Sequence, residues 1–209
     1  MIVLKNTFII TVLILFLSIE GCAEKKSESD KLFEILRTGN NLERIKGSEK
    51  LLEMGVSIED KLIKHLEEES ENKRKSIIWI LGELGDKRNV RHITLFIDHS
   101  HDLTRFVLTA LGKIGDRETI PIIVKKLRNK SRYIRTDAIR ALGRIGDKKA
   151  LPYLIEAKSD SDWHVREAAA IAFGKIGGPD AISHLKDMAN NDPDSVVQIS
   201  AEESLEMQF

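Results

Sequence analysis

A six-residue phrase that returns at a nearly fixed interval constrains the fold of this chain more than any other feature. Its copies begin at Leu81, Leu111, Leu142 and Phe173, and the first three read Leu-Gly-x-(Leu or Ile)-Gly-Asp. The copies lie 30, 31 and 31 residues apart, and Leu205 stands where a fifth copy would begin. A repeat of this period builds an elongated molecule in which each unit buries its apolar face against its neighbours. The sequence therefore predicts a repeat protein with an extended surface of the kind that binds partners.

The segment 149–176 gives the clearest view of one repeating unit. Ala150–Ala157 predicts a first helix with Pro152 in its first turn, and residues 158–162 form a turn rich in helix N-cap residues. Apolar side chains along Trp163–Ile176 recur at i, i+4, i+7 and i+11, which is one face of a second helix. Two glycines then end that helix. Its predicted buried face is Val165, Ala169, Ala172 and Ile176, and the equivalent helix Arg132–Ile145 buries Ile134, Ala138, Ala141 and Ile145. The unit is helix–turn–helix, and the predicted fold class is all-α.

The positions of a few polar residues make the kind of repeat more specific. Pro152, Asp160 and Arg166 have the spacing of HEAT repeats, and the ending phrase is similar to the short HEAT-like repeats of the phycobilin lyase type. This resemblance implies a right-handed α-solenoid of about five helix–turn–helix repeats. It also implies an internal hydrogen-bonding ladder, in which Asp160 pairs with Arg166, and in which Arg135 and Arg74 have the same structural role in other repeats.

The resemblance also suggests how the chain is divided. A repeat domain is expected over residues 31–209, with clear repeats over about 58–209 and a degenerate leading repeat over 31–57 that caps the stack. The repeats differ in quality, because Thr104 and Gln198 stand where other units have the ladder arginine.

The N-terminal segment differs from the rest. Phe8–Leu17 is almost continuously apolar, too short for a membrane span of about 20 residues but as long as a signal-peptide core. It leads into Gly21 and Cys22, the one cysteine of the chain, and this arrangement resembles the lipobox of bacterial lipoproteins. The resemblance implies a signal peptide over 1–21, export, and lipidation of Cys22 that anchors the protein to a membrane of the bacterial cell envelope. The polar residues 22–30 are expected to form a flexible tether. An uncleaved anchor and an ordinary signal peptide are the alternatives.

The outward positions of the second helices suggest where a partner binds. In HEAT-type solenoids these helices line the concave surface. Opposite the predicted buried face, the middle repeats carry basic residues, and the two tryptophans of the chain flank them. An outward tryptophan is typical of a binding hot spot, although its ring can instead pack as peripheral core. The predicted partner-binding residues are Trp79, Arg105, Lys113, Arg132, Arg140, Arg144, Trp163 and Ile171.

Charge is distributed unevenly along the chain. The 33 basic and 33 acidic residues cancel, but residues 111–149 carry 12 Lys/Arg against 4 Asp/Glu, and residues 150–209 carry 4 against 11. A basic centre suits an acidic or carboxylate-bearing protein partner, since arginine makes forked contacts with carboxylates. A merely solvated basic face and head-to-tail self-association remain alternatives. A neutral, exported chain does not favour nucleic-acid binding.

Little in the sequence indicates catalysis. The six histidines are scattered, and the one tight cluster with metal-ligand residue types, residues 99–102, falls in a predicted surface turn. No H-E-x-x-H, G-x-S-x-G or P-loop motif occurs, so no metal, cofactor or catalytic residue is predicted. The sequence favours a non-catalytic protein-binding scaffold. A HEAT-like lyase or isomerase acting on a small ligand, and a structural self-associating envelope protein, are the alternatives.

Overall fold

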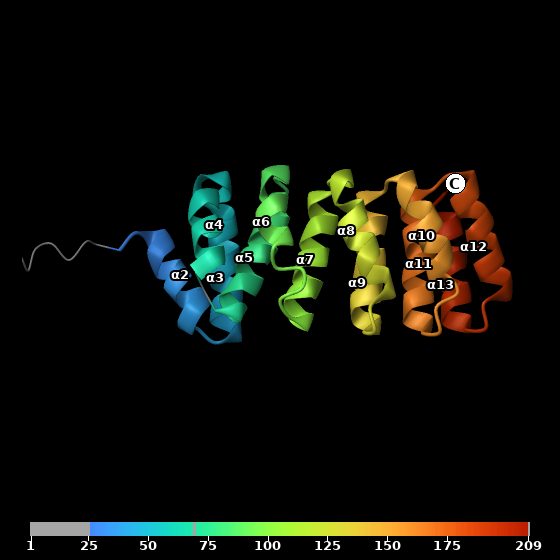
Figure 1. Ribbon diagram of the computed structural model, residues 1–209, viewed down its shortest axis with the longest axis horizontal. Helices are drawn as coiled ribbons and strands as arrows, with labels where there is room; N and C mark the ends of the chain where they lie inside the picture. The colour runs from blue at the N-terminus through green and yellow to red at the C-terminus, as the bar shows by residue number, and fades with distance from the viewer. Residues whose placement is uncertain (1–25, 69, 209) are drawn as a thin grey trace, which may run out of the picture.

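The protein forms a single row of antiparallel helix pairs (Figure 1). The computed structural model describes residues 26–68 and 70–208, and this part of the chain contains twelve α-helices and no strand. The predicted signal peptide, 1–21, and Cys22 lie outside the described residues. The helices pair in chain order as α2 (Glu28–Thr38) with α3 (Asn41–Glu53), α4 (Glu59–Glu68) with α5 (Glu71–Leu84), α6 (Val90–Thr94) with α7 (His101–Ile114), α8 (Ile120–Val124) with α9 (Arg132–Ile145), α10 (Leu151–Ala157) with α11 (Trp163–Ile176), and α12 (Pro179–Asn191) with α13 (Ser195–Glu206).

The prediction of an all-α solenoid of HEAT-like repeats is confirmed. Five pairs follow a leading pair, as expected, and the second helices α9 and α11 have the bounds that the apolar periodicity predicted. Their predicted core positions Ile134, Ala138, Val165 and Ala169 are buried. These residues belong to one continuous aliphatic core that runs through the whole stack. Each pair therefore depends on its neighbours for burial of its apolar face.

Each fixed polar or glycine residue of the repeated phrase has its own structural role, as the copy at 142–147 shows. A Cβ on Gly143 would lie 2.8 Å from the Cβ of Ala172, so this glycine lets the next second helix approach closely. Gly146 ends α9 in the left-handed conformation with a φ of 69°. A carboxylate oxygen of Asp147 then accepts a hydrogen bond from the backbone N–H of Lys149 at 2.9 Å and caps the following turn.

The first helix begins earlier than the sequence indicated. Residues 22–30 were expected to form a tether, but α2 already starts at Glu28. The reason is a capping box, in which the hydroxyl of Ser27 accepts from the backbone N–H of Asp30, and the Asp30 carboxylate accepts from the backbone N–H of Ser27. Residues 28–30 therefore belong to the first helix.

The predicted ladder exists, but it joins neighbouring repeats. Asp160 was expected to pair with Arg166. Its carboxylate instead accepts two hydrogen bonds, of 2.7 and 2.8 Å, from Arg135 of the preceding repeat. Arg166 donates to the backbone oxygen of Asp160 at 2.9 Å and directs its guanidinium to Asp192 of the following repeat. Arg74 donates to the backbone oxygen of Leu66. The pairing differs from the prediction because each interhelix turn lies against the second helix of the repeat before it.

Candidate partner-binding groove

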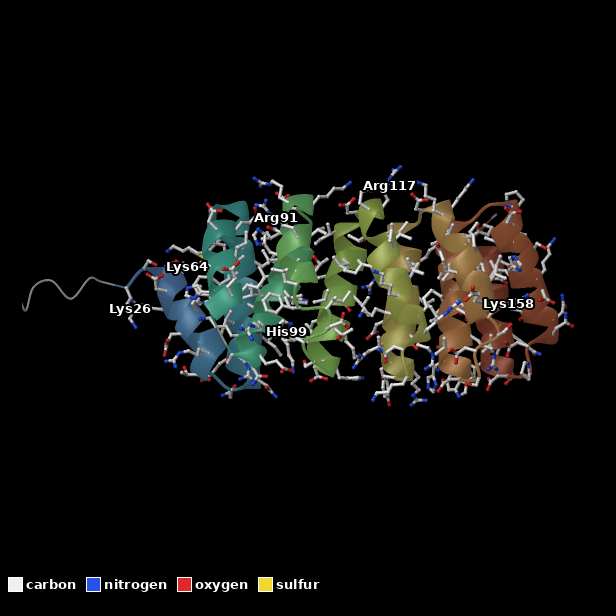
Figure 2. All side chains as sticks on the ribbon, viewed as in Figure 1. Lys26, Lys64, Arg91, His99, Arg117 and Lys158 are labelled. Carbon is white, nitrogen blue, oxygen red and sulfur yellow. The ribbon has the colours of Figure 1, made fainter. Side chains whose placement is uncertain are left out.

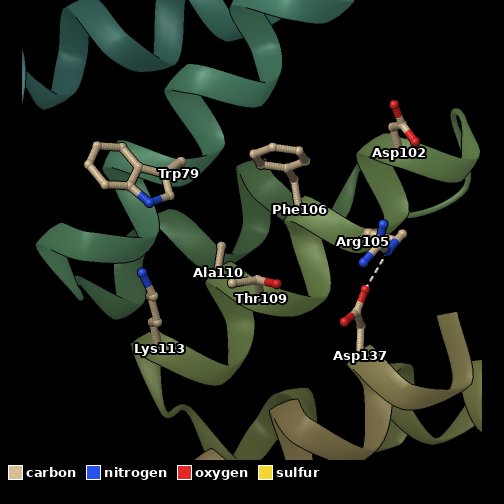
Figure 3. Close-up of a pocket in the computed structure, with 8 residues that line it drawn as sticks. All are labelled: Trp79, Asp102, Arg105, Phe106, Thr109, Ala110, Lys113 and Asp137. Atoms are coloured by element: carbon tan, nitrogen blue, oxygen red, sulfur yellow. Dashed lines mark hydrogen bonds and ion pairs between the residues drawn. The ribbon is translucent and has the colours of Figure 1, made fainter. Parts of the chain in front are cut away.

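Three clefts follow one another along the second helices. The first, here called the apolar cleft, has a volume of about 440 Å³ and lies between α3, α5 and α7, with Ile45, Trp79 and Phe106 in its wall. The middle cleft, of about 320 Å³, shares Trp79 and Phe106 with it (Figure 3). The arginine cleft, of about 250 Å³, shares Arg105 and Asp137 with the middle cleft and reaches α11. Since adjacent clefts share side chains, they form one continuous groove.

Two aromatic side chains stand where the apolar and middle clefts meet. Trp79 is half-buried and packs against the core, while Phe106 is 37% exposed. Figure 3 shows both rings at the groove wall, with Lys113 below the indole. The Lys113 Nζ lies 5.8 Å from the Trp79 ring centroid and also pairs with Glu83. The Trp79 ring is therefore both peripheral core and groove wall, and its role as a binding hot spot stays a prediction.

The basic centre predicted from the sequence is partly neutralised by nearby carboxylates. Arg105 donates to Asp137 through Nε at 2.6 Å, and Arg140 lies 4.0 Å from the same carboxylate. Arg132 pairs with Asp162 at 3.2 Å. The Asp137 side chain is only 11% exposed, so it lies beneath the arginines. The groove thus presents paired cations above partly buried carboxylates.

Tyr133 holds two of the arginines in place. Its ring centroid lies 5.4 Å from the guanidinium carbon of Arg105 and 4.8 Å from that of Arg132, which are cation–π distances. Arg132 also donates to the Tyr133 hydroxyl at 3.1 Å. This hydrogen bond, with the positive charge of Arg132, lowers the pKa of Tyr133 below its ordinary value. The same bond, together with Asp162, raises the pKa of Arg132.

Another ion-paired cation, Lys75, lines the apolar cleft, and its partner Asp102 lines the middle cleft. Lys75 of α5 contacts Asp102 of α7 at 2.8 Å and Glu71 of its own helix at 3.2 Å. The hydrogen bond that Lys75 donates to Asp102 is the main reason that the pKa of Lys75 is raised, and the same contact lowers the pKa of Asp102. This bridge links the two helices on the groove side.

The remaining predicted residues lie near the groove without forming the walls of the three clefts. Arg144 is exposed near the end of α9, and Ile171 is half-buried on α11. Trp163 packs against the core, and its ring stacks on that of His164 at 3.6 Å between centroids. Of the eight predicted residues, the three clefts bring together Trp79, Arg105, Lys113, Arg132 and Arg140.

Sequence reasoning missed several groove residues. Phe106 and Tyr133 directly follow the predicted residues Arg105 and Arg132, Asp137 lies between Arg132 and Arg140 on one helix, and Ile45 belongs to the degenerate leading repeat. The predicted set of outward positions was too narrow, because the exposed face of a helix includes the neighbouring column of residues. A wider set on each second helix would have included Phe106, Tyr133 and Asp137.

The described residues hold neither a metal site nor a membrane span. No group of three His, Cys, Asp or Glu side chains in this part of the chain is arranged to hold a metal ion. In the cluster at 99–102, His101 instead contacts the Ser131 hydroxyl at 2.9 Å. Among the helices described, none is long and apolar enough to cross a bilayer.

A comparison with known protein families identifies the type of repeat. The family model of HEAT repeats matches residues 94–159 and 120–206. No match was found among the curated proteins.

Solved structures share the fold. The phycocyanin lyase complex of CpcE and CpcF from Nostoc sp. PCC7120 matches with a TM-score of 0.60 and 24% identity, over 72% of this chain and 65% of that chain. The chain thus spans less than two thirds of the lyase chain. YibA of E. coli matches with a TM-score of 0.63 and 23% identity, over 87% and 70%. A designed armadillo repeat protein in complex with the peptide (KR)4 matches with a TM-score of 0.54 and 18% identity, over 88% and 100%. At these identities the likeness is one of fold.

Proposed function

Because this chain belongs to the HEAT-repeat proteins, we propose that it is a non-catalytic scaffold that binds a protein partner in the groove along its second helices. The observation that carries this proposal is the continuity of three clefts across neighbouring repeats, with Trp79 and Phe106 in one part and paired arginines in another. Aromatic residues and arginines dominate the binding energy of many protein interfaces. Protein binding by this fold also has examples among the similar structures, one in complex with a peptide and one a complex of CpcE with CpcF.

The proposal is tested by capture of a partner from a detergent-solubilised envelope fraction. Phe106→Ala combined with Arg140→Glu removes one apolar anchor and reverses one charge of the groove. The matched control combines Leu95→Ala with Arg117→Glu, because both side chains are exposed. Leu95 lies on the side of the first helices, and Arg117 lies at the edge between two repeats (Figure 2). We expect the control to capture the partner and the groove variant to lose it, with equal helicity by circular dichroism. Equal capture by both variants would move the interface out of the groove.

We further propose that the scaffold is held at the cell envelope by lipidation of Cys22. The support is the signal-peptide-like segment before Cys22 and the short stretch between Cys22 and the start of α2 at Glu28. Six residues of extended chain span only about 20 Å, which would keep the solenoid near the membrane surface. The test is metabolic labelling with a fatty acid in wild type and Cys22→Ser. Label and membrane association that persist in Cys22→Ser would reject the anchor.

Two alternatives remain testable. A lyase or isomerase acting on a small ligand is suggested by the match to a phycocyanin lyase complex, and it predicts a ligand that copurifies and is detected by mass spectrometry. A structural self-associating protein predicts a molar mass in light scattering that rises with protein concentration and falls with added salt.

A further inference from the structure

The arginine cleft gathers three guanidinium groups from two helices. Arg105 comes from α7, while Arg132 and Arg140 come from α9 and lie about two helical turns apart. Each of these side chains is 39–49% exposed, so each reaches solvent at the mouth of the cleft. Three like charges around one small cleft repel each other, and an anion placed among them relieves that repulsion.

The carboxylates nearby compensate this charge only in part. Asp137 holds Arg105 through Nε and lies 4.0 Å from Arg140, beyond hydrogen-bond distance. Asp162 pairs with Arg132 from outside the cleft lining. Within the described residues, two carboxylates therefore face three guanidiniums. Since each guanidinium has five N–H donors, the cleft keeps donors for a further acceptor.

The cleft is also preorganised. The Tyr133 ring is within cation–π distance of both Arg105 and Arg132, and the Tyr133 hydroxyl accepts from Arg132. Arg132 additionally contacts the His164 ring nitrogen Nδ1 at 3.1 Å. Side chains held this way lose little conformational freedom when a ligand binds.

We infer that the arginine cleft binds a carboxylate side chain of a peptide segment whose apolar side chain occupies the apolar cleft. This inference rests on the proposed function and names the chemistry of the partner. The apolar cleft is centred on α5 and the arginine cleft on α9, two second helices further along. Neighbouring second helices lie about 8–10 Å apart, so the two clefts are separated by roughly 16–20 Å. An extended chain covers this distance in about five residues. The recognised segment is therefore a large apolar residue followed or preceded, about five positions away, by Asp or Glu.

The groove favours a single carboxylate over a polyanion. The excess is one positive charge, and carboxylates of Glu71, Asp102 and Asp137 line or flank the rest of the groove. A nucleic acid or an anionic lipid surface needs several phosphate contacts and no adjoining apolar cleft. The apolar cleft with Ile45, Trp79 and Phe106 instead suits an aliphatic or aromatic side chain.

The test uses isothermal titration calorimetry with a capped eight-residue Ser/Gly peptide that carries Leu and Asp five positions apart. A second peptide has Asn in place of Asp, and a third has Ser in place of Leu. We expect each replacement to weaken binding by about tenfold or more, since the Asn peptide loses a charge-assisted hydrogen bond and the Ser peptide loses the burial of an apolar side chain. Arg140→Gln is expected to weaken binding of the Asp peptide by a similar factor but not that of the Asn peptide. Arg117→Gln is the matched control and is expected to bind like wild type.

Several results would overturn the inference. The first is that the Asp peptide does not bind at millimolar concentration, and the second is that the Asn peptide binds as tightly as the Asp peptide. The third is that equimolar inorganic phosphate displaces the Asp peptide, which would make the cleft a phosphate site. Partner capture separates this failure from failure of the proposed function. If Phe106→Ala abolishes capture and Arg140→Gln does not, the groove binds a partner without the carboxylate contact. If neither affects capture, the proposed function itself is wrong.

Discussion

At the scale of single residues, the glycines inside the second helices set the distance between repeats. A Cβ at Gly82, Gly112, Gly143 or Gly174 would lie 2.8 Å from an atom of the next second helix. Contacts this short do not occur between such atoms, so any side chain at these positions forces the neighbouring helices to shift. The local helix preference for alanine is overridden by the packing of the stack.

We therefore expect Gly143→Ala to lower the free energy of unfolding by about 1–3 kcal/mol, because the added methyl overpacks against Ala172. Urea denaturation followed by circular dichroism measures the change. Gly47→Ala in α3 is the control, since its Cβ would meet a side-chain methyl group of Ile35 at the longer distance of 3.2 Å. A loss at Gly47 as large as that at Gly143 would contradict the explanation by interhelix packing.

The two ion pairs of the ladder differ in burial, and this difference predicts which of them costs more stability when it is broken. In the Arg166–Asp192 pair the side chains are 10% and 4% exposed, while in the Arg135–Asp160 pair both are 15% exposed. Removing one partner of a buried pair leaves an uncompensated charge and costs about 3–5 kcal/mol. We expect this loss for Asp192→Ala in thermal or urea unfolding and a smaller one for Asp160→Ala. A larger loss for Asp160→Ala than for Asp192→Ala would show that burial of the ion pair does not decide its contribution.

At the scale of the helix, the end of the first helix is capped by the second helix in each of the five pairs that follow α2–α3. A side chain of the second helix donates to a backbone oxygen at that end. The donor–acceptor pairs are Arg74 with Leu66, Thr104 with Ile97, Arg135 with Asn129, Arg166 with Asp160, and Gln198 with Asp192. The replacements Thr104 and Gln198 are departures from the repeat pattern in sequence, yet they preserve the same hydrogen bond.

Thr104→Val tests this cap with little change of shape. Thr104 is buried and donates to the Ile97 oxygen at 2.6 Å, so valine would leave a buried carbonyl without this donor. We expect a loss of about 1–3 kcal/mol in the free energy of unfolding. The control is Thr109→Val, at a partly exposed groove position on the same helix. Equal stability of the two variants would show that the cap contributes nothing.

At the scale of the whole molecule, many exposed ion pairs link neighbouring repeats or their turns. Hydrogen bonds from Arg88, Lys75 and Lys158 lower the pKa values of Asp86, Asp102 and Asp187, respectively, below the ordinary value. A depressed carboxyl pKa in the folded state stabilises the fold above the unfolded pKa, and this stabilisation is lost as the pH falls through the folded pKa. The pairs are exposed, so each contribution is small and screened by salt.

We therefore expect the free energy of unfolding to fall as the pH decreases below about 4, with a smaller fall at high salt. Urea titrations between neutral and strongly acidic pH, with and without added sodium chloride, measure both effects. A free energy that rises on acidification would contradict the direction of these pKa shifts.

The sequence by itself determined the repeat, the fold class, the bounds of α9 and α11, and the buried face of each second helix. These features depend on local patterns, because helix periodicity, capping and glycine stops act within one unit of about 30 residues. Periodicity also predicted eight outward residues, and five of these line the three clefts. Only the tertiary structure decided which charges are paired and where the clefts lie. Asp137 neutralises Arg105 across two repeats, 32 residues away, and Arg135 reaches Asp160. Such contacts depend on how far and at what angle one repeat stacks on the next, and no pattern within a single repeat contains that information.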